Sequence, residues 1–114
     1  MLYRLLILFI VFITGSDIYS ASPPAVICEL KGTVYIEEFP ERANFLIYEE
    51  DSEAFADMLI YEMDNALFAT KAGIWYFTDQ KGFADFSVYF VESKGNSDFT
   101  VYFTSYESLA GCSD

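Results

Sequence analysis

The sequence predicts a mainly β domain of six or seven short strands, each built from one repeating unit. Six times a tyrosine follows a branched or aromatic apolar residue, with spacings of 13, 13, 15, 13 and 13, at Tyr35, Tyr48, Tyr61, Tyr76, Tyr89 and Tyr102. A fixed period indicates one structural unit used repeatedly. Apolar and polar side chains alternate around each tyrosine, which is typical of strands, and short connectors separate the alternating stretches.

Residues 1–22 differ from the repeats and are predicted to be a secretory signal peptide. Leu5–Ile13 is wholly apolar and follows Arg4. The run is shorter than the ~20 residues of a membrane-spanning helix, so we expect no stable span once the leader is removed. Cleavage is expected near Ser20–Ser22, which makes the protein secreted or periplasmic. The alternative is an uncleaved leader that anchors the protein to a membrane.

Residues 27–114 are expected to form one small, repeat-built β domain. Cys28 lies just before the first repeat and Cys112 lies at the end of the last. In an oxidising compartment such a pair predicts a disulfide, which small domains with a limited core often need. Two independent thiols are the alternative.

The strand stretches predict which side chains form the core. In the stretch at residues 85–90, Phe86, Val88 and Phe90 fall on one side, and Ser87 and Tyr89 fall on the other. The apolar side is the expected core face. The corresponding core residues in the other units are Phe45, Ile47, Met58, Ile60, Phe99, Val101 and Phe103, and Trp75 occupies the slot of Val88.

The connectors predict two kinds of turn. Lys81-Gly82 and Lys94-Gly95 favour tight turns with a glycine at positive φ. Residues 52–55 and 65–68 resemble single helical turns, each opened by a polar residue that can cap it. Four connector phenylalanines are expected to plug the ends of the core, namely Phe39, Phe55, Phe68 and Phe83. An Asp or Asn follows the small residue of most connectors, at Asn44, Asp57, Asp85 and Asp98.

The arrangement of the strands is less determined by the repeat. A strand and connector of 13 residues are too short for a crossover through a full helix, so the period alone favours an antiparallel meander or a β-solenoid. A meander of nearly identical strands specifies its register weakly and exposes two edges.

One repeated phrase points to a known family. The phrase Ala-Asp-Phe-x-Val-Tyr-Phe at 84–90, the Lys-Gly connectors and the closing segment 106–111 resemble the septoil-knot domain family of small bacterial proteins, formerly a domain of unknown function. The likeness runs from about Gly32 to Gly111 and implies a compact β domain threaded into a seven-crossing torus knot, with no known active site. The first units depart from the phrase at Pro40, and at Glu49 and Glu62 in place of Phe.

Charge and composition restrict the chemistry. The net charge of −12 repels phosphate backbones and anionic lipid, so no nucleic-acid binding is expected. The chain has no histidine, which removes the commonest general base and metal ligand. The acidic stretch Glu49, Glu50, Asp51 and Glu53 could supply a catalytic pair or a calcium site, but it lacks a matching pattern for either. A solvated connector is preferred, and no cofactor or metal is predicted.

The tyrosines are interpreted as a second packed layer with hydroxyls reaching water, in preference to a binding face. No residue is therefore assigned to catalysis. The sequence predicts an exported, acidic, non-enzymatic domain of unknown biochemical activity, acting as a structural or surface-interaction protein. The alternative is an acidic binding or inhibitory protein for a basic partner protein, because opposite charge speeds and selects association.

Overall fold

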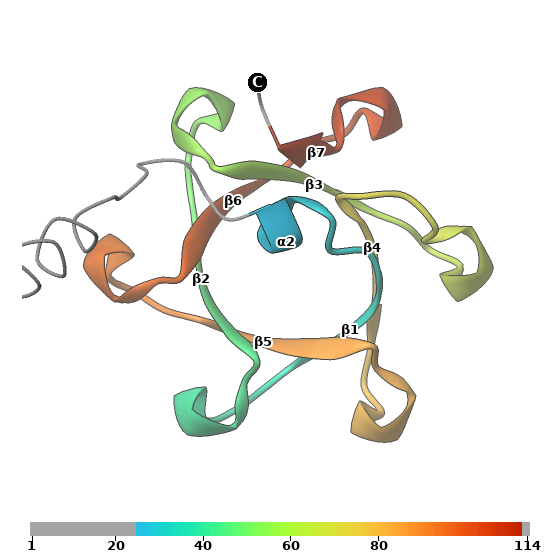
Figure 1. The fold of residues 1–114 in the computed structure, drawn as a ribbon, viewed down its shortest axis with the longest axis horizontal. Coiled ribbons are helices and arrows are strands. Elements are labelled where there is room, and N and C mark those ends of the chain that lie inside the picture. Colours follow the sequence, from blue (N-terminus) through green and yellow to red (C-terminus); the bar gives the residue numbers. More distant parts are fainter. Residues whose placement is uncertain (1–24, 113–114) are drawn as a thin grey trace, which may run out of the picture.

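The computed structural model describes residues 25–112 (Figure 1). The predicted signal peptide, residues 1–22, lies outside the described residues. One short helix, α2 (Ala25–Cys28), precedes seven strands, which are β1 (Gly32–Ile36), β2 (Phe45–Glu49), β3 (Met58–Glu62), β4 (Ile74–Thr78), β5 (Phe86–Phe90), β6 (Phe99–Phe103) and β7 (Gly111–Cys112). The predicted mainly β class and the number of strands are confirmed.

Each connector contains one 3₁₀ turn, which we call a knuckle. The knuckles are η1 (Pro40–Arg42), η2 (Glu53–Phe55), η3 (Ala66–Phe68), η4 (Lys81–Phe83), η5 (Lys94–Asn96) and η6 (Glu107–Leu109). The predicted caps are confirmed, because the side chains of Ser52 and Asn65 accept hydrogen bonds from the amides of Ala54 and Leu67. The prediction of positive-φ turns at Gly82 and Gly95 is wrong, since both glycines adopt the same 3₁₀ turn as the other units.

Six strands form a closed parallel sheet in the order β4-β1-β5-β2-β6-β3, and pairing of β3 with β4 closes the ring. β1, β2 and β3 belong to a first winding of the chain, and β4, β5 and β6 belong to a second. The two windings alternate around the ring, so most connectors pass outside a strand of the other winding (Figure 1). The β3–β4 connector joins neighbours and carries the two extra residues of the third unit.

The parallel direction corrects the expectation of an antiparallel meander or a solenoid. Each strand of the ring has only five residues, about 17 Å of chain at roughly 3.3 Å per residue. A connector such as 37–44, nearly extended on both sides of its knuckle, can span roughly 25 Å. It therefore returns to the starting end of the barrel and steps over one strand without needing a full helix.

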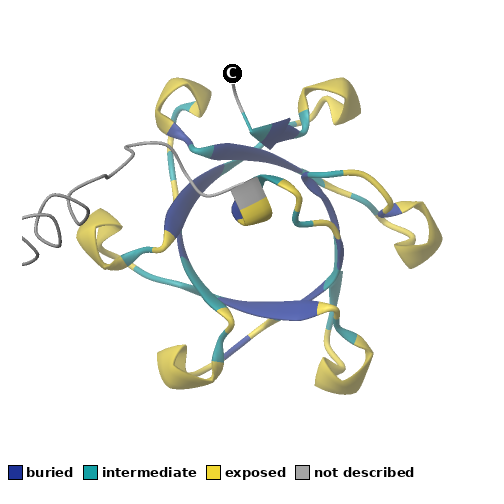
Figure 2. Cartoon of the chain, in the orientation of Figure 1, coloured by how far each residue is buried: buried dark blue, intermediate teal, exposed yellow. Residues whose placement is uncertain are grey.

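The core lies inside the barrel in layers. The middle layer takes one residue from each ring strand, and all six side chains are fully buried: Val34, Ile47, Ile60, Trp75, Val88 and Val101. A layer below contains Phe45, Met58, Phe86 and Phe99, and the ring of Phe45 meets those of Phe86 and Phe99 edge to face. The alternation of the sequence therefore identified the core face, including Trp75, and Figure 2 shows the ring of strands buried while the knuckles are exposed.

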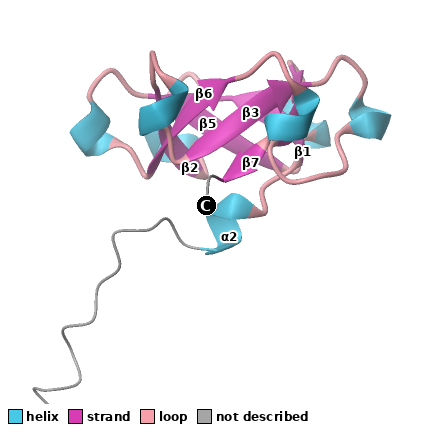
Figure 3. Ribbon diagram, turned by 90° about the horizontal axis from the view of Figure 1, so that it is seen from above, coloured by secondary structure: helices cyan, strands magenta, loops and turns pink. Residues whose placement is uncertain are grey.

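The helix α2 covers the end of the barrel where the parallel strands begin (Figure 3). Ile27 is buried against the core, and the carbonyl of Leu30 accepts a hydrogen bond of 3.1 Å from the indole N–H of Trp75. Cys28 forms a disulfide with Cys112, with Cα atoms 5.3 Å apart. The two chain ends of the described domain are therefore joined at the covered end.

The recurring Asp and Asn side chains tie neighbouring strands together at that same end. The Asp85, Asn44, Asp98 and Asp57 side chains accept hydrogen bonds from the amides of Thr33, Ser87, Leu46 and Thr100, at 2.7–3.0 Å. Each pair joins the start of one strand to its neighbour in the ring, from β1 through β5, β2 and β6 to β3. We call these four contacts the Asx clamps, and they assign a structural role to the recurrent Asp or Asn.

Candidate interaction surfaces

The knuckles present apolar side chains to solvent. Phe55, Phe68 and Phe83 are 68%, 60% and 73% exposed, and Phe39 is 49% exposed. The prediction that these four residues plug the ends of the core is wrong. All connectors except the one between β3 and β4 arch around a strand of the other winding, and all six knuckles lie outside the barrel, where a side chain cannot reach the core (Figure 2).

The exposed apolar side chains are unevenly distributed around the ring. The last residue of the knuckle is Phe55, Leu109, Phe68 and Phe83 on η2, η6, η3 and η4, and these four knuckles follow one another around the barrel (Figure 1). We call these four residues the apolar rim. The last residue is Arg42 on η1 and Asn96 on η5. The Arg42 guanidinium also lies 5.2 Å from the centre of the Phe39 ring, which makes that knuckle more polar.

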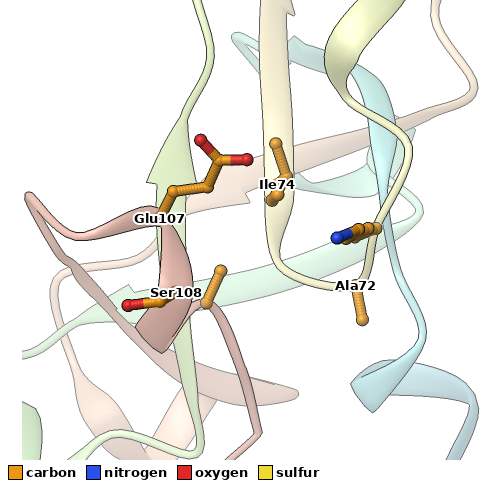
Figure 4. Close-up of a pocket in the computed structure, with 6 residues that line it drawn as sticks. Ala72, Ile74, Glu107 and Ser108 are labelled. Carbon is orange, nitrogen blue, oxygen red and sulfur yellow. The ribbon is translucent and has the colours of Figure 1, made fainter.

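A hollow of about 460 Å³ lies within the arc of the apolar rim (Figure 4). It is lined by Lys71, Ala72, Ile74, Glu107, Ser108 and Ala110, from the long β3–β4 connector and the η6 region. Figure 4 shows Glu107 and Ser108 on one side of the space and Ala72 on the other. The hollow thus marks the place where the first winding passes into the second.

The open end of the barrel, where the parallel strands finish, has an aromatic floor. Phe77, Phe90 and Phe103 are half-buried there, with Phe103 lying 6.1 Å from Phe77 and 6.3 Å from Phe90 between ring centroids. All three come from the second winding, and around the ring they alternate with Ile36, Glu49 and Glu62 of the first. The floor therefore holds three large rings and not six, because Ile36, Glu49 and Glu62 stand where the second winding has Phe.

Carboxylates surround this open end. The residue three positions after the repeat tyrosine is acidic and exposed in five of the six units, at Glu38, Asp51, Asp64, Asp79 and Glu92. Because the six ring strands are parallel, these side chains leave the barrel at one end. The open end therefore concentrates negative charge around an apolar floor.

The four residues of the acidic stretch, Glu49, Glu50, Asp51 and Glu53, differ in their surroundings. Glu49, Asp51 and Glu53 are exposed, whereas the Glu50 carboxylate is largely buried and lies 2.6 Å from the Lys94 ammonium. The hydrogen bond to Glu50 raises the pKa of Lys94, and burial partly opposes it. Among residues 25–112, no three His, Cys, Asp or Glu side chains are grouped as metal ligands would be.

A second ion pair repeats the first at the equivalent place in the ring. The Lys81 ammonium contacts the buried carboxylate of Glu37. Each pair joins the connector after a strand of the first winding to a knuckle of the second. The two partners of each pair are 44 residues apart in sequence, so sequence reasoning missed the pairs. A possible signal was the recurrence of Lys at the start of η4 and η5 and of Glu three units earlier in the chain.

The six tyrosines of the repeat are all half-buried. They alternate with the core residues and therefore lie on the outer face of the barrel, beneath the connectors. This agrees with a second packed layer. Within residues 25–112, no helix has the length and apolar character needed to cross a membrane.

The fold and its surfaces define a class: a small closed β domain whose chain passes twice around one barrel, with the second passage interleaved between the strands of the first. The model of the 7(1) septoil knot domain family matches residues 27–113, and the chain belongs to that family. The interleaved double winding is consistent with the knot after which the family is named. Neither the curated proteins nor the solved structures contain a match to the chain.

Proposed function

We propose that this protein is an exported, non-enzymatic domain that acts through surface contacts, and that the apolar rim is its main contact surface. The supporting observation is the gathering of exposed Phe55, Phe68, Phe83 and Leu109 on four consecutive knuckles. Exposed aromatic side chains on a rigid scaffold are typical anchors of protein interfaces. Membership of the septoil knot family supports a small β domain as the scaffold.

The scaffold suits this role because the backbone that carries the apolar rim is ordered before a partner binds. Each knuckle is a single 3₁₀ turn between two strands of a closed barrel, and the Asx clamps and ion pairs join neighbouring units. A partner therefore meets side chains whose backbone is already ordered, which lowers the entropy lost on binding.

A basic partner protein is the more specific proposal, because the surface around the anchors is acidic. The net charge is −12, and an exposed carboxylate lies near the start of the connectors that carry η2, η3 and η4, at Asp51, Asp64 and Asp79. Charge of one sign around apolar anchors favours rapid association with a surface of opposite sign, and this attraction weakens with salt.

The test compares two variants with matched changes. In the first, Phe55, Phe68 and Phe83 become Asn, the residue that the chain itself has on η5. In the second, Arg42→Asn and Asn96→Ser alter the two polar knuckles. Cross-linking on the surface of the producing cells should yield a defined adduct with the wild type and the second variant, and lose it with the first. Equal adducts from all three proteins, or none from the wild type, would contradict the proposed contact surface.

Export is tested separately from contact. The mass and the first residue of the protein recovered from outside the cytoplasm should show cleavage near Ser20–Ser22. Recovery only as the uncleaved chain, held in the membrane fraction, would support the anchored alternative.

A further inference from the structure

A second hollow lies at the open end of the barrel, between β1 and β4. It has a volume of about 460 Å³ and is lined by Tyr35, Ile36, Glu38, Phe77, Thr78 and Asp79. We call it the β1–β4 hollow. The two strands are paired in register here, with Tyr35 beside Thr78 and Val34 beside Phe77, so its walls are held by a hydrogen-bonded ladder.

The floor of the β1–β4 hollow is apolar and accessible. Ile36 is 45% exposed, and Tyr35 and Phe77 are half-buried. Elsewhere in the first winding the position of Ile36 is occupied by Glu49 or Glu62. Two apolar residues of that layer, Ile36 and Phe77, therefore line the hollow between β1 and β4, together with the aromatic ring of Tyr35.

Two carboxylates border this apolar floor. Glu38 and Asp79 lie in the connectors that leave β1 and β4, both are exposed, and within residues 25–112 neither is in an ion pair. Lys81, the lysine nearest to Asp79 along the chain, contacts the carboxylate of Glu37. The negative charge at the hollow is therefore not neutralised by a neighbouring unit.

We infer that the β1–β4 hollow binds a cationic side chain of a partner protein, with arginine preferred over lysine. The aliphatic stem would lie on Ile36, and the charged head would meet the aromatic rings and the carboxylates of Glu38 and Asp79. A guanidinium stacks on aromatic faces and pairs with carboxylates through two parallel hydrogen bonds, which an ammonium cannot do. The inference rests on the proposed function, and it names the chemistry of the partner residue.

The first experiment needs no partner protein. Nα-acetyl-arginine N-methylamide is titrated into the oxidised, ¹⁵N-labelled protein, and amide signals are followed by NMR. The signals of Tyr35, Ile36, Thr78 and Asp79 should shift together, while those of Ala72 and Ser108 at the other hollow should not. The citrulline counterpart has the same shape without the charge and should bind at least roughly tenfold more weakly. The lysine derivative should bind more weakly than arginine.

Paired variants separate a site from general attraction to an acidic surface. Glu38→Gln with Asp79→Asn should weaken arginine binding about tenfold, because both carboxylates at the hollow are lost. Asp51→Asn with Asp64→Asn removes the same charge from the same repeat position elsewhere at the open end, and binding should stay within about twofold. Equal weakening by the two pairs, or equal affinity for citrulline and arginine, overturns the inference.

The outcome is also distinguishable from failure of the proposed contact surface. If cross-linking depends on Phe55, Phe68 and Phe83 but arginine does not bind, only the β1–β4 hollow is refuted. If arginine binds as expected but no adduct depends on the apolar rim, the cation site stands and the apolar rim is refuted.

Discussion

Four strand pairs, β1–β5, β5–β2, β2–β6 and β6–β3, share one repeated contact. The junction between β3 and β4, in contrast, is held by contacts that occur only once in the molecule. Each ladder of the first group has an Asx clamp at its start. The β3–β4 ladder contains two paired residues on each strand, Tyr61 with Ile74 and Glu62 with Trp75. We call the first region the clamped arc and the second the seam.

The first half of β3 is left unpaired by β4, and β7 occupies it in the antiparallel direction, with Met58 opposite Cys112. The disulfide then connects β7 to α2, and Leu30, two residues after α2, accepts a hydrogen bond from the Trp75 indole of β4 through its carbonyl. A repeat can supply identical contacts wherever its neighbours are identical. Where the chain begins, ends and changes winding, neighbours differ, and stability depends on unique contacts.

This comparison predicts that the largest loss of stability follows removal of the disulfide. Cys28 and Cys112 are 84 residues apart, and opening a loop of that length costs about 4.5 kcal/mol in the chain-entropy model. The variant Cys28→Ser with Cys112→Ser should lower the free energy of unfolding in urea by about that amount. The wild type measured in reductant serves as the matched control and should fall equally. A loss below about 1 kcal/mol would show that the seam does not depend on the bridge.

The next largest effect is expected at Gly73, within the seam. Its φ is +81°, and an added Cβ would lie 2.2 Å from the amide nitrogen of Gly111 and 2.8 Å from the carbonyl oxygen of Leu59. Strain at positive φ and displacement of β7 together should make Gly73→Ala cost about 3 kcal/mol. Thermal and urea unfolding measure the change.

Gly82 is the matched control for that prediction. A Cβ there would meet no atom within 4 Å, and its φ is not positive. Gly82→Ala should change the free energy of unfolding by less than about 1 kcal/mol, in either direction. Similar losses from both glycines would remove the distinction between the seam and the knuckles.

The clamped arc was more predictable from the sequence than the seam or the order of strands. Alternation around Val88 identified the core face, and Ser52 and Asn65 were recognisable as the capping residues of η2 and η3. Both properties depend on residues only a few positions apart. The order of strands depends on which of several nearly identical strands pairs with which, so local pattern does not contain it. The resemblance to the septoil-knot family supplied the threaded fold that the period of 13 did not.

The candidate surfaces were less predictable for a related reason. Phe55 and Phe83 are apolar residues in short connectors, and without the interleaved topology their natural place is against the core. The partner of Glu50 is Lys94, and the partner of Asp98 is the amide of Leu46. The partners of these two contacts are 44 and 52 residues apart in the sequence. The recurrence of Asp and Lys was therefore visible in the sequence, but the contacts that these residues make could be assigned only from the order of strands in the ring.

A smaller effect is expected from a single Asx clamp in the clamped arc. The amide of Leu46 donates a 2.7 Å hydrogen bond to the Asp98 carboxylate in an exposed place. Asp98→Ala should lower the free energy of unfolding by about 1 kcal/mol, and Asp98→Asn should lose less because its amide oxygen still accepts. A cost for Asp98→Ala equal to that of Gly73→Ala would show that one clamp matters as much as the seam.

The smallest effect concerns the pH dependence of the Lys94–Glu50 pair within the clamped arc. The hydrogen bond to Glu50 raises the pKa of Lys94 in the folded protein above its usual 10.5. The folded state therefore holds this proton more tightly than the unfolded chain does. The stabilisation is fully present below the unfolded pKa of about 10.4 and is lost as the pH rises through the folded value.

Comparison with a lysine variant isolates this contribution from the titration of other groups. The difference in urea midpoint between the wild type and Lys94→Met should be constant from pH 7 to about 9.5 and should shrink above about pH 10.4. Lys71→Met is the control, since Lys71 is exposed at the seam and has no ion pair within the described part of the chain. Its difference from the wild type should not follow the same curve. If the Lys94→Met difference stayed constant at high pH, the charge of Lys94 would not be the source of the stabilisation, because only the charge is lost on titration.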